Sequence, residues 1–231
     1  MPVDKRTYSN LMIVEGMDDR HSIAGLIRHH VSWPDEPKAW PVYIEIGRSV
    51  EVILANGYLT AELKASNVRT VGVVLDADEH AHGRYQRIAQ LMSGMFATLP
   101  AGVPKNGLVI ENLDQKRFGL WLMPDNESVG DLETFLRFLV PDAHSPLWQH
   151  ACGSVTKARA DGAPCHDSHV PKANLYTWLA WQEPPGQSPG LALTQKILNP
   201  AVGDPLSRFR HLAATSCKEI SCHREGTVRA I

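Results

Sequence analysis

Short, continuous runs of apolar residues recur through the first half of the chain. Runs of this kind predict strands that are buried on both faces of a sheet, as in parallel α/β folds. The strongest lies at 70–75, where the sequence reads Thr-Val-Gly-Val-Val-Leu. The other predicted strands are residues 10–14, 42–46, 108–110 and 118–123.

Between most of these runs, apolar residues recur at the spacing of a helix face. Ile23, Leu26 and Ile27 make one such face. Asp18 and Asp19 precede it and suit the first turn of a helix, where carboxylates oppose the helix dipole favourably. Further helices are predicted over 50–66, broken near Gly57, over 85–95 and from about residue 129. Alternation across 10–140 predicts an α/β fold with a mostly parallel sheet flanked by helices.

The pattern changes after Pro141. Residues 144–169 are rich in His, Gly and Ala, and no element is predicted there. Beyond them, residues 173–182, 191–198 and 206–214 are predicted to be helical. We therefore expect an α/β core at 8–140, a helical C-terminal extension packed on it at 141–215, and a flexible tail at 216–231.

The composition is that of a folded globular protein, with 43% hydrophobic and 21% charged residues among 231. A formal net charge of -2 gives no overall signature of nucleic-acid binding, so any such contact must be local. The chain has neither an apolar signal core nor a run approaching the ~20 apolar residues that span a bilayer. These features predict a cytoplasmic protein without a membrane partner.

Acidic residues follow two of the predicted strands. Glu15 ends the first strand, and Asp76 and Asp78 follow the strand at 70–75. The carboxyl ends of parallel strands face the crevice in which open α/β sheets bind ligands. Three carboxylates gathered there would repel one another unless a hard divalent cation such as Mg²⁺ neutralised them.

An Asp-x-Asp pair after a strand is also common in helix caps and ordinary loops. The pairing of Glu15-Gly16 at one strand end with Asp76 and Asp78 at another is more specific. The two motifs lie some sixty residues apart within alternating strands and helices. Together they favour a ligand site over a structural role.

Residues 13–19, Ile-Val-Glu-Gly-Met-Asp-Asp, resemble the first motif of the Toprim domain, and residues 73–78, Val-Val-Leu-Asp-Ala-Asp, resemble the second. The segments 123–133 and 179–183 resemble a stand-alone Toprim-like family related to the OLD (overcoming lysogenization defect) nucleases. The resemblance spans most of residues 8–215. It implies a Rossmann-like Toprim fold that binds Mg²⁺ or Mn²⁺ and acts on phosphodiester bonds.

The resemblance also implies roles for individual residues. Glu15 and Asp19 match the first OLD-type motif and would share one metal ion. Asp76 and Asp78 would hold the same ion or a second one. Two ions about 4 Å apart would activate the attacking water and stabilise the leaving oxygen.

Three later residues complete the site that the resemblance implies. Glu133 matches the acidic position of a second metal site, and Asp131 could assist it. Lys172 is the best match to a lysine near the scissile phosphate, with Lys157 as the reserve. Glu15, Asp76, Asp78 and Lys172 would then form the catalytic set.

The leading hypothesis is a Mg²⁺-dependent nuclease that cleaves DNA or RNA with a metal-activated water. The chain offers neither the tyrosine-bearing domain of a topoisomerase nor the zinc module of a primase. The alternative is a non-catalytic Toprim-like module that binds a nucleotide or a partner such as an ATPase, which the modest net charge would suit. A third possibility is a phosphoacceptor aspartate at Asp76, as in response regulators.

Other conspicuous residues permit two interpretations. Trp178 and Trp181 could stack on bases, but helical spacing makes them better candidates for the hydrophobic core. His80 and His82 could touch a metal or phosphate, although their loop is expected to be exposed. Arg84 and Arg87 on the following helix could contact phosphate or simply be solvated.

Overall fold

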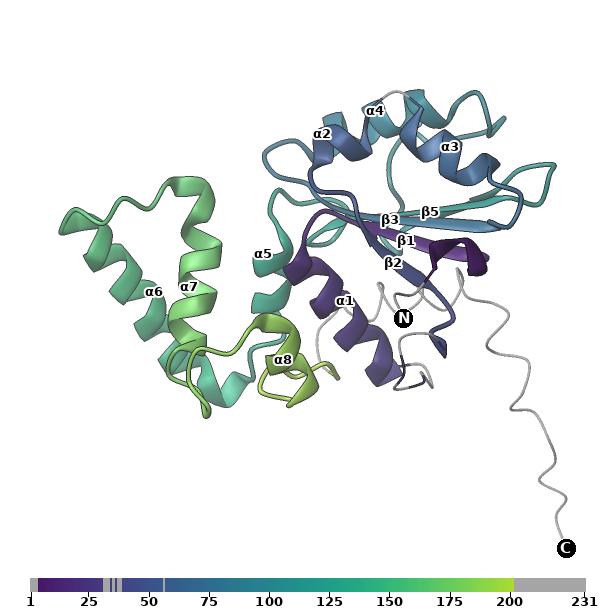
Figure 1. Ribbon diagram of the computed structural model, residues 1–231. Coiled ribbons are helices and arrows are strands. Elements are labelled where there is room, and N and C mark those ends of the chain that lie inside the picture. Colours follow the sequence, from purple (N-terminus) through teal and green to yellow (C-terminus); the bar gives the residue numbers. More distant parts are fainter. Residues whose placement is uncertain (1–3, 31–33, 35, 37–38, 56, 202–231) are drawn as a thin grey trace, which may run out of the picture.

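A five-stranded sheet with helices on both faces forms the centre of the molecule (Figure 1). The computed structural model describes residues 4–30, 34, 36, 39–55 and 57–201. The predicted helix at 206–214 and the predicted tail at 216–231 lie outside these residues. The strands are β1 (Asn10–Val14), β2 (Tyr43–Ile46), β3 (Thr70–Asp76), β4 (Leu108–Glu111) and β5 (Arg117–Met123).

The helices follow the strands in the order that the sequence predicts. The first five are α1 (Met17–His30), α2 (Val50–Ile53), α3 (Tyr58–Lys64), α4 (Ala81–Met92) and α5 (Leu132–Arg137). Two of these helices begin at residues other than the predicted ones. α4 starts four residues before Tyr85, and α5 starts after Asp131, whose side chain caps it by accepting a hydrogen bond from the Thr134 N–H.

The strand order is β2-β1-β3-β5-β4, which confirms the predicted α/β fold. β1 pairs in parallel with β2 and β3, β3 pairs in parallel with β5, and β4 runs antiparallel to β5 at the edge. The chain leaves β1 toward β2 and leaves β3 toward the opposite edge. The crevice between the carboxyl ends of β1 and β3 is therefore a topological switch point, where sheets of this type bind ligands.

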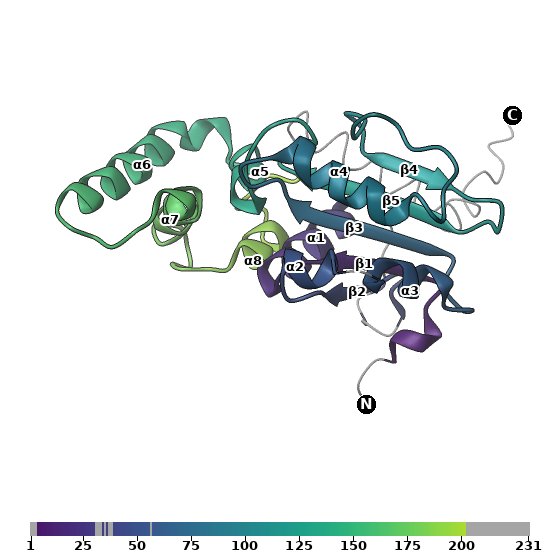
Figure 2. The same cartoon turned by 90° about the horizontal axis from the view of Figure 1, so that it is seen from above.

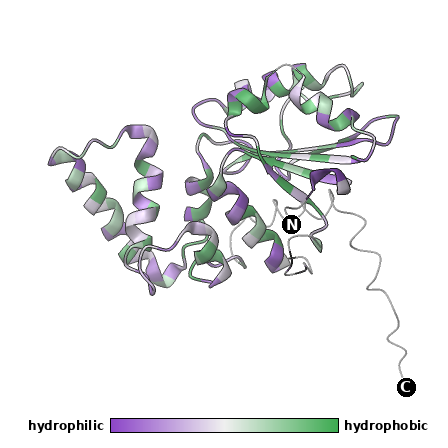
Figure 3. Cartoon of the chain, in the orientation of Figure 1, coloured by the Kyte–Doolittle hydropathy of each residue, from purple (hydrophilic) through white to green (hydrophobic). Residues whose placement is uncertain are grey.

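Alternate residues of the central strands enter two separate hydrophobic layers. Met12, Val14 and Val74 pack with α1, α5, α7 and α8, whereas Ile13 and Val73 pack with α2, α3 and α4. Figure 1 shows α1, α5 and α8 on the side of the sheet opposite α2, α3 and α4, and Figure 3 shows the apolar strands between them. Since side chains alternate along a strand, each strand contributes to both layers.

The chain after Pro141 forms a helical extension made of α6 (Ser145–Ala160), α7 (Val170–Leu179) and α8 (Pro189–Thr194). Short 3₁₀ turns precede α6 and α7, at Asp142–His144 (η3) and Asp167–His169 (η4). α7 packs between α6 and α5, and α8 packs on α1. Figure 2 shows α6 and α7 projecting from one end of the sheet. Among the described residues of this extension, α8 contacts the core through α1 and α7 contacts it through α5.

The sequence does not predict α6, because the apolar face of this helix is sparse. The residues that it buries are Trp148, Ala151 and Val155, set among Gly, Ala and Ser. The contact between α8 and α1 is also close. A side chain at Gly190 would place its Cβ 2.5 Å from the His21 Cβ and 2.9 Å from the His21 carbonyl carbon, so this packing requires glycine.

Two tryptophans near the end of α7 differ sharply in burial. Trp178 is fully buried beside Trp148, with ring centroids 6.4 Å apart, as predicted. The prediction that Trp181 is also a core residue is wrong, because it is 43% exposed and lies against His150. The helix ends at Leu179, so the spacing that relates the two residues does not continue to Trp181.

Trp178→Ala is expected to lower the free energy of unfolding by about 3 kcal/mol, because it opens a large cavity among α5, α6 and α7. Urea unfolding monitored by circular dichroism would measure this loss. Trp181→Ala is the matched control and should cost under about 1 kcal/mol. Equal losses in the two variants would contradict the packing described for α7.

None of the described helices combines the length and the hydropathy that crossing a bilayer requires.

Candidate metal centre

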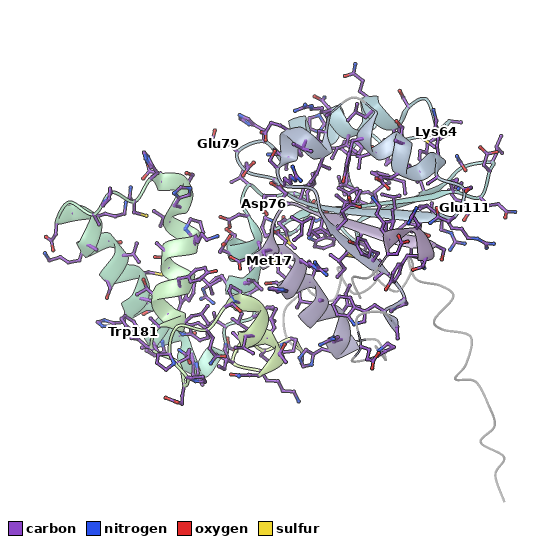
Figure 4. All side chains as sticks on the ribbon, in the orientation of Figure 1. Met17, Lys64, Asp76, Glu79, Glu111 and Trp181 are labelled. Atoms are coloured by element: carbon purple, nitrogen blue, oxygen red, sulfur yellow. The ribbon has the colours of Figure 1, made fainter. Side chains whose placement is uncertain are left out.

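The ends of β1 and β3 meet through the side chain of Glu15. Its Oε1 accepts a hydrogen bond from the backbone N–H of Asp76 at 3.0 Å. The two strands are in register, with Ile13 opposite Val73, so their carboxyl ends reach the same edge of the sheet. Figure 4 shows Asp76 at the end of the sheet nearest the helical extension. Glu15 and Asp76 are therefore brought together as predicted.

Asp19 joins this pair from the first turn of α1. Its Oδ2 accepts a hydrogen bond from the Gly16 N–H at 3.0 Å, and the residue is only 9% exposed. A Cβ at position 16 would lie 3.2 Å from that same oxygen. Glycine after Glu15 thus gives the Asp19 carboxylate room to fold back over the turn.

The N-terminus of α5 also contacts Asp76. The Oδ1 of Asp76 accepts a hydrogen bond from the Leu132 N–H at 2.9 Å. Asp131 caps the same helix, with its Oδ1 2.8 Å from the Thr134 N and 2.6 Å from the Thr134 Oγ1. The helix N-terminus that follows Asp131 therefore holds Asp76 in place.

Glu133 is buried in the first turn of α5 and is paired with a lysine of the extension. Its Oε1 lies 3.3 Å from Nζ of Lys172, which also lies 3.6 Å from Oδ2 of Asp18. The Tyr176 hydroxyl donates a hydrogen bond of 2.7 Å to the same Asp18 oxygen. α7 thus supplies a cation to Glu133 and a hydroxyl to Asp18.

We define the acidic cluster as Glu15, Asp19, Asp76, Asp131 and Glu133. Burial, and after it the charges of the other four members, together raise the pKa of Asp76 to about 9. Burial is also the main cause that raises the pKa values of Glu15, Asp19 and Glu133. The raised pKa values mean that ionising these carboxylates together is unfavourable unless a positive charge is added.

Asp78 is placed apart from the cluster, on the other side of the β3 end. It adopts φ +50°, and its backbone N–H and C=O both pair with Gly130 at 2.9 Å. Its side chain is 58% exposed and forms an ion pair with Arg84. Its charge still raises the pKa of Glu15, although burial has a larger effect there. The two aspartates that the sequence places together therefore point toward different helices, α5 and α4.

The donor set of the acidic cluster suits a hard divalent cation. All of its members offer carboxylate oxygens, which are the protein ligands that Mg²⁺ and Mn²⁺ prefer. The hydrogen bonds from Asp76, Gly16 and Leu132 each engage one oxygen, and a carboxylate can still offer its other oxygen to a cation. Across residues 4–30 and 39–201, apart from residue 56, no three carboxylate, imidazole or thiolate groups are already arranged around one point. A bound ion would have to draw these oxygens together.

Comparison with known protein families adds one finding. Residues 9–208 match the model of a family described as "Protein of unknown function (DUF3226)". The chain belongs to this family. The match covers the sheet, the acidic cluster and the described helices of the extension, so the family model includes every element that borders the candidate site. No curated protein and no solved structure matches the chain.

Two neighbours of the cluster were not anticipated as site residues. Tyr176 lies on α7, two residues before Trp178, and its hydroxyl contacts Asp18. Asp18 was interpreted only as part of the first turn of α1. Contacts between residues 158 positions apart leave no local signal in a single sequence, so the meeting of these two side chains could not be predicted.

His80 and His82 are exposed, in agreement with the plainer of the two interpretations. His82 contacts Gln86 on its own helix.

Lys172→Met is expected to reduce any metal-dependent activity about 10- to 100-fold, because Glu133 would lose the cation that orients it. Lys157→Met is the matched control. Lys157, the reserve candidate, pairs instead with the exposed Asp161 at 2.5 Å on the far end of α6. Steady-state kinetics would compare the two variants. A larger loss with Lys157→Met would transfer the assignment to that lysine.

Proposed function

We propose that the chain is a Mg²⁺- or Mn²⁺-dependent phosphodiesterase that cleaves nucleic acid at the acidic cluster. The observation that carries this proposal is that Asp76, at the switch point between β1 and β3, is buried among other acids. Their charges raise its pKa, and they are Glu15, Asp19, Asp131 and Glu133. Their chemistry is that of a cation site, and phosphoryl transfer is the chemistry that such cations serve most directly.

The resemblance of the two strand-end motifs to those of Toprim domains supports the same proposal. Glu15 and Asp19 provide the first motif, and Asp76 and Asp78 provide the second. The metal, when bound, would activate water and neutralise the charge that develops on the phosphate. Lys172 is the cation beside the cluster that could approach the phosphate, since its side chain is 51% exposed.

The proposal divides the cluster into metal ligands and neighbouring acids. Glu15, Asp76 and Glu133 would hold the metal or metals, with Asp19 and Asp131 beside them. The backbone hydrogen bonds to Glu15 and Asp76 fix one oxygen of each, which preorganises the site before the metal binds. Asp78 would join the ligands only if its ion pair with Arg84 opened.

A non-catalytic module that binds a nucleotide or an ATPase partner is the second candidate. The net charge of -2 favours it, because an autonomous nuclease usually has a basic track along its substrate path. In either case we propose that the protein acts in the cytoplasm.

Cleavage assays distinguish these two candidates. Purified protein would be incubated with single- and double-stranded DNA and RNA, in Mg²⁺, in Mn²⁺ and in EDTA. We expect metal-dependent cleavage that falls at least about 100-fold in Glu15→Gln, which keeps the hydrogen-bond acceptor but removes the charge. Glu111→Gln is the control, because Glu111 pairs with Arg117 at the opposite end of the sheet (Figure 4). Intact substrates in both metals would contradict the enzymatic proposal.

A further inference from the structure

A pocket of about 510 Å³ opens beside the acidic cluster, on the α4 side of Asp78. α2, the loop after β3 and the first turns of α4 form three of its sides. Ser168, in the 3₁₀ turn before α7, reaches it from the helical extension. Because Ala77 directly follows Asp76, this open pocket adjoins the candidate site, and both the core and the extension contribute to its lining.

The inner wall of the pocket is apolar. Val50, Leu54 and Ala77 line it, and they are 9%, 1% and 1% exposed. Gly83 on α4 adds a position without a side chain. A Cβ there would meet only the His80 Cβ, at 3.6 Å, so the space over Gly83 is open. A flat apolar group of the size of a nucleobase suits such a wall, since ligand pockets of about 300–1,000 Å³ bury most of a small ligand.

Charged groups surround the apolar wall. Arg84 and Arg87 present two guanidinium groups on one face of α4. Arg87 donates a long hydrogen bond of 3.4 Å to the Leu54 carbonyl, and Arg84 pairs with Asp78 at the border with the acidic cluster. The carboxylates of Glu51, Asp78 and Glu79 also line the pocket, and a carboxylate can accept a hydrogen bond from an exocyclic amino group. Guanidinium groups both pair with phosphate and stack on bases.

We propose that this pocket holds the nucleotide adjoining the scissile phosphate, with its base against Val50, Leu54 and Ala77 and its phosphate facing Arg84 and Arg87. This inference rests on the proposed function and names its substrate class. The base must be unpaired, because a base within a duplex is stacked and cannot enter a pocket without being flipped out. The substrate is therefore a single strand, or an unpaired end or loop of a folded strand.

Binding and small-substrate hydrolysis test the pocket separately from the acidic cluster. Binding would be measured by fluorescence anisotropy of a labelled single-stranded oligonucleotide in Ca²⁺. Hydrolysis would be measured with methyl p-nitrophenyl phosphate in Mg²⁺, since this diester contains no nucleoside. Gly83→Leu fills the pocket, and Gly153→Leu is its control, because position 153 is on a helix with nothing within 4 Å of its Cβ.

We expect Gly83→Leu to weaken oligonucleotide binding at least about tenfold and to leave hydrolysis of the small diester unchanged. Arg87→Ala should weaken oligonucleotide binding about fivefold. Lys64→Ala is its control, because Lys64 lies near the far end of the sheet (Figure 4). If Gly83→Leu does not fold, the Arg87→Ala result alone tests the pocket. Gly153→Leu should bind as the wild type does.

Three results would overturn the inference. The first is wild-type binding by both Gly83→Leu and Arg87→Ala. The second is tighter binding of a blunt duplex than of the single strand. The third is competition by free mononucleotides at the concentration of the oligonucleotide, which would assign the pocket to a free nucleotide. If the wild type hydrolyses no diester while Gly83→Leu still loses oligonucleotide binding, the nucleotide pocket stands and the proposed function fails.

Discussion

Asp76→Asn is expected to abolish phosphodiester cleavage and, at the same time, to stabilise the metal-free protein. Asp76 is the most strongly perturbed acid of the cluster, with a pKa raised to about 9 by burial and by four neighbouring carboxylates. Asparagine keeps the oxygen that accepts the hydrogen bond from Leu132 and removes the charge. The variant thus separates the structural role of the side chain from its electrostatic role.

The expected loss in kcat is at least about a thousandfold, as for other acids that are central to catalysis. The expected gain in the free energy of unfolding is about 1–3 kcal/mol at about pH 8, because Asp76 must take up a proton when the wild type folds at this pH, whereas asparagine needs none. Kinetics and urea unfolding of the same preparation in EDTA would measure the two effects.

Asp161→Asn is the matched control for this pair of measurements. Asp161 is exposed and pairs only with the neighbouring Lys157 among its described contacts, so both activity and stability should change little. If Asp76→Asn lowered stability and activity together, Asp76 would be a structural cap of α5, and the charge that we assign to the site would have no functional meaning.

The affinity for Mg²⁺ is expected to rise steeply with pH, by about a thousandfold between about pH 6 and about pH 9. A metal ligand must be deprotonated, and Asp76 keeps its proton up to about pH 9 in the metal-free fold. One proton released for each ion bound gives a tenfold change in affinity for each pH unit.

The stability of the metal-free protein should change in the opposite direction. An unfolded aspartate loses its proton near pH 4, whereas folded Asp76 retains it to about pH 9. Between these values the folded state binds more protons than the unfolded state, so the free energy of unfolding falls as pH rises. Glu15, Asp19 and Glu133, whose pKa values are also raised, add to this fall.

Thermal unfolding with and without Mg²⁺, at several pH values, measures both trends. The stabilisation at a metal concentration of 100 times Kd should reach about 2.7 kcal/mol. In Asp76→Asn the dependence of stability on pH should be shallower and the effect of the metal should vanish. Affinity for Mg²⁺ that does not depend on pH would place the ion away from Asp76.

The sheet could be predicted from the sequence because its strands are buried on both faces. The runs at 70–75 and 118–123 lie at the centre of the sheet, where no exposed face interrupts the apolar pattern. The antiparallel direction of β4 and the existence of α6 could not be predicted. β4 is a short edge strand, and α6 buries only three residues. The pattern at 108–110 predicts a strand but not its direction, and the pattern of α6 is too weak to predict a helix.

The position of the acidic residues was predictable, but the direction of their side chains was not. Strand ends fix where Glu15 and Asp76 lie, since parallel strands share an edge. Asp78 turns away because φ +50° and the bridge to Gly130 set its backbone, and neither feature is visible in an Asp-Ala-Asp sequence. The contacts of Lys172 and Tyr176 depend on how α7 packs against α5, which is a tertiary property.

The most direct test of the central claim is the anomalous-scattering map of crystals soaked in Mn²⁺, because it locates the cation without reference to activity. We predict an anomalous peak bounded by the carboxylates of Glu15, Asp76 and Glu133, absent from Asp76→Asn crystals treated in the same way. A peak elsewhere on the chain, or no peak at these carboxylates in saturating Mn²⁺, would contradict the assignment of a metal centre to the acidic cluster.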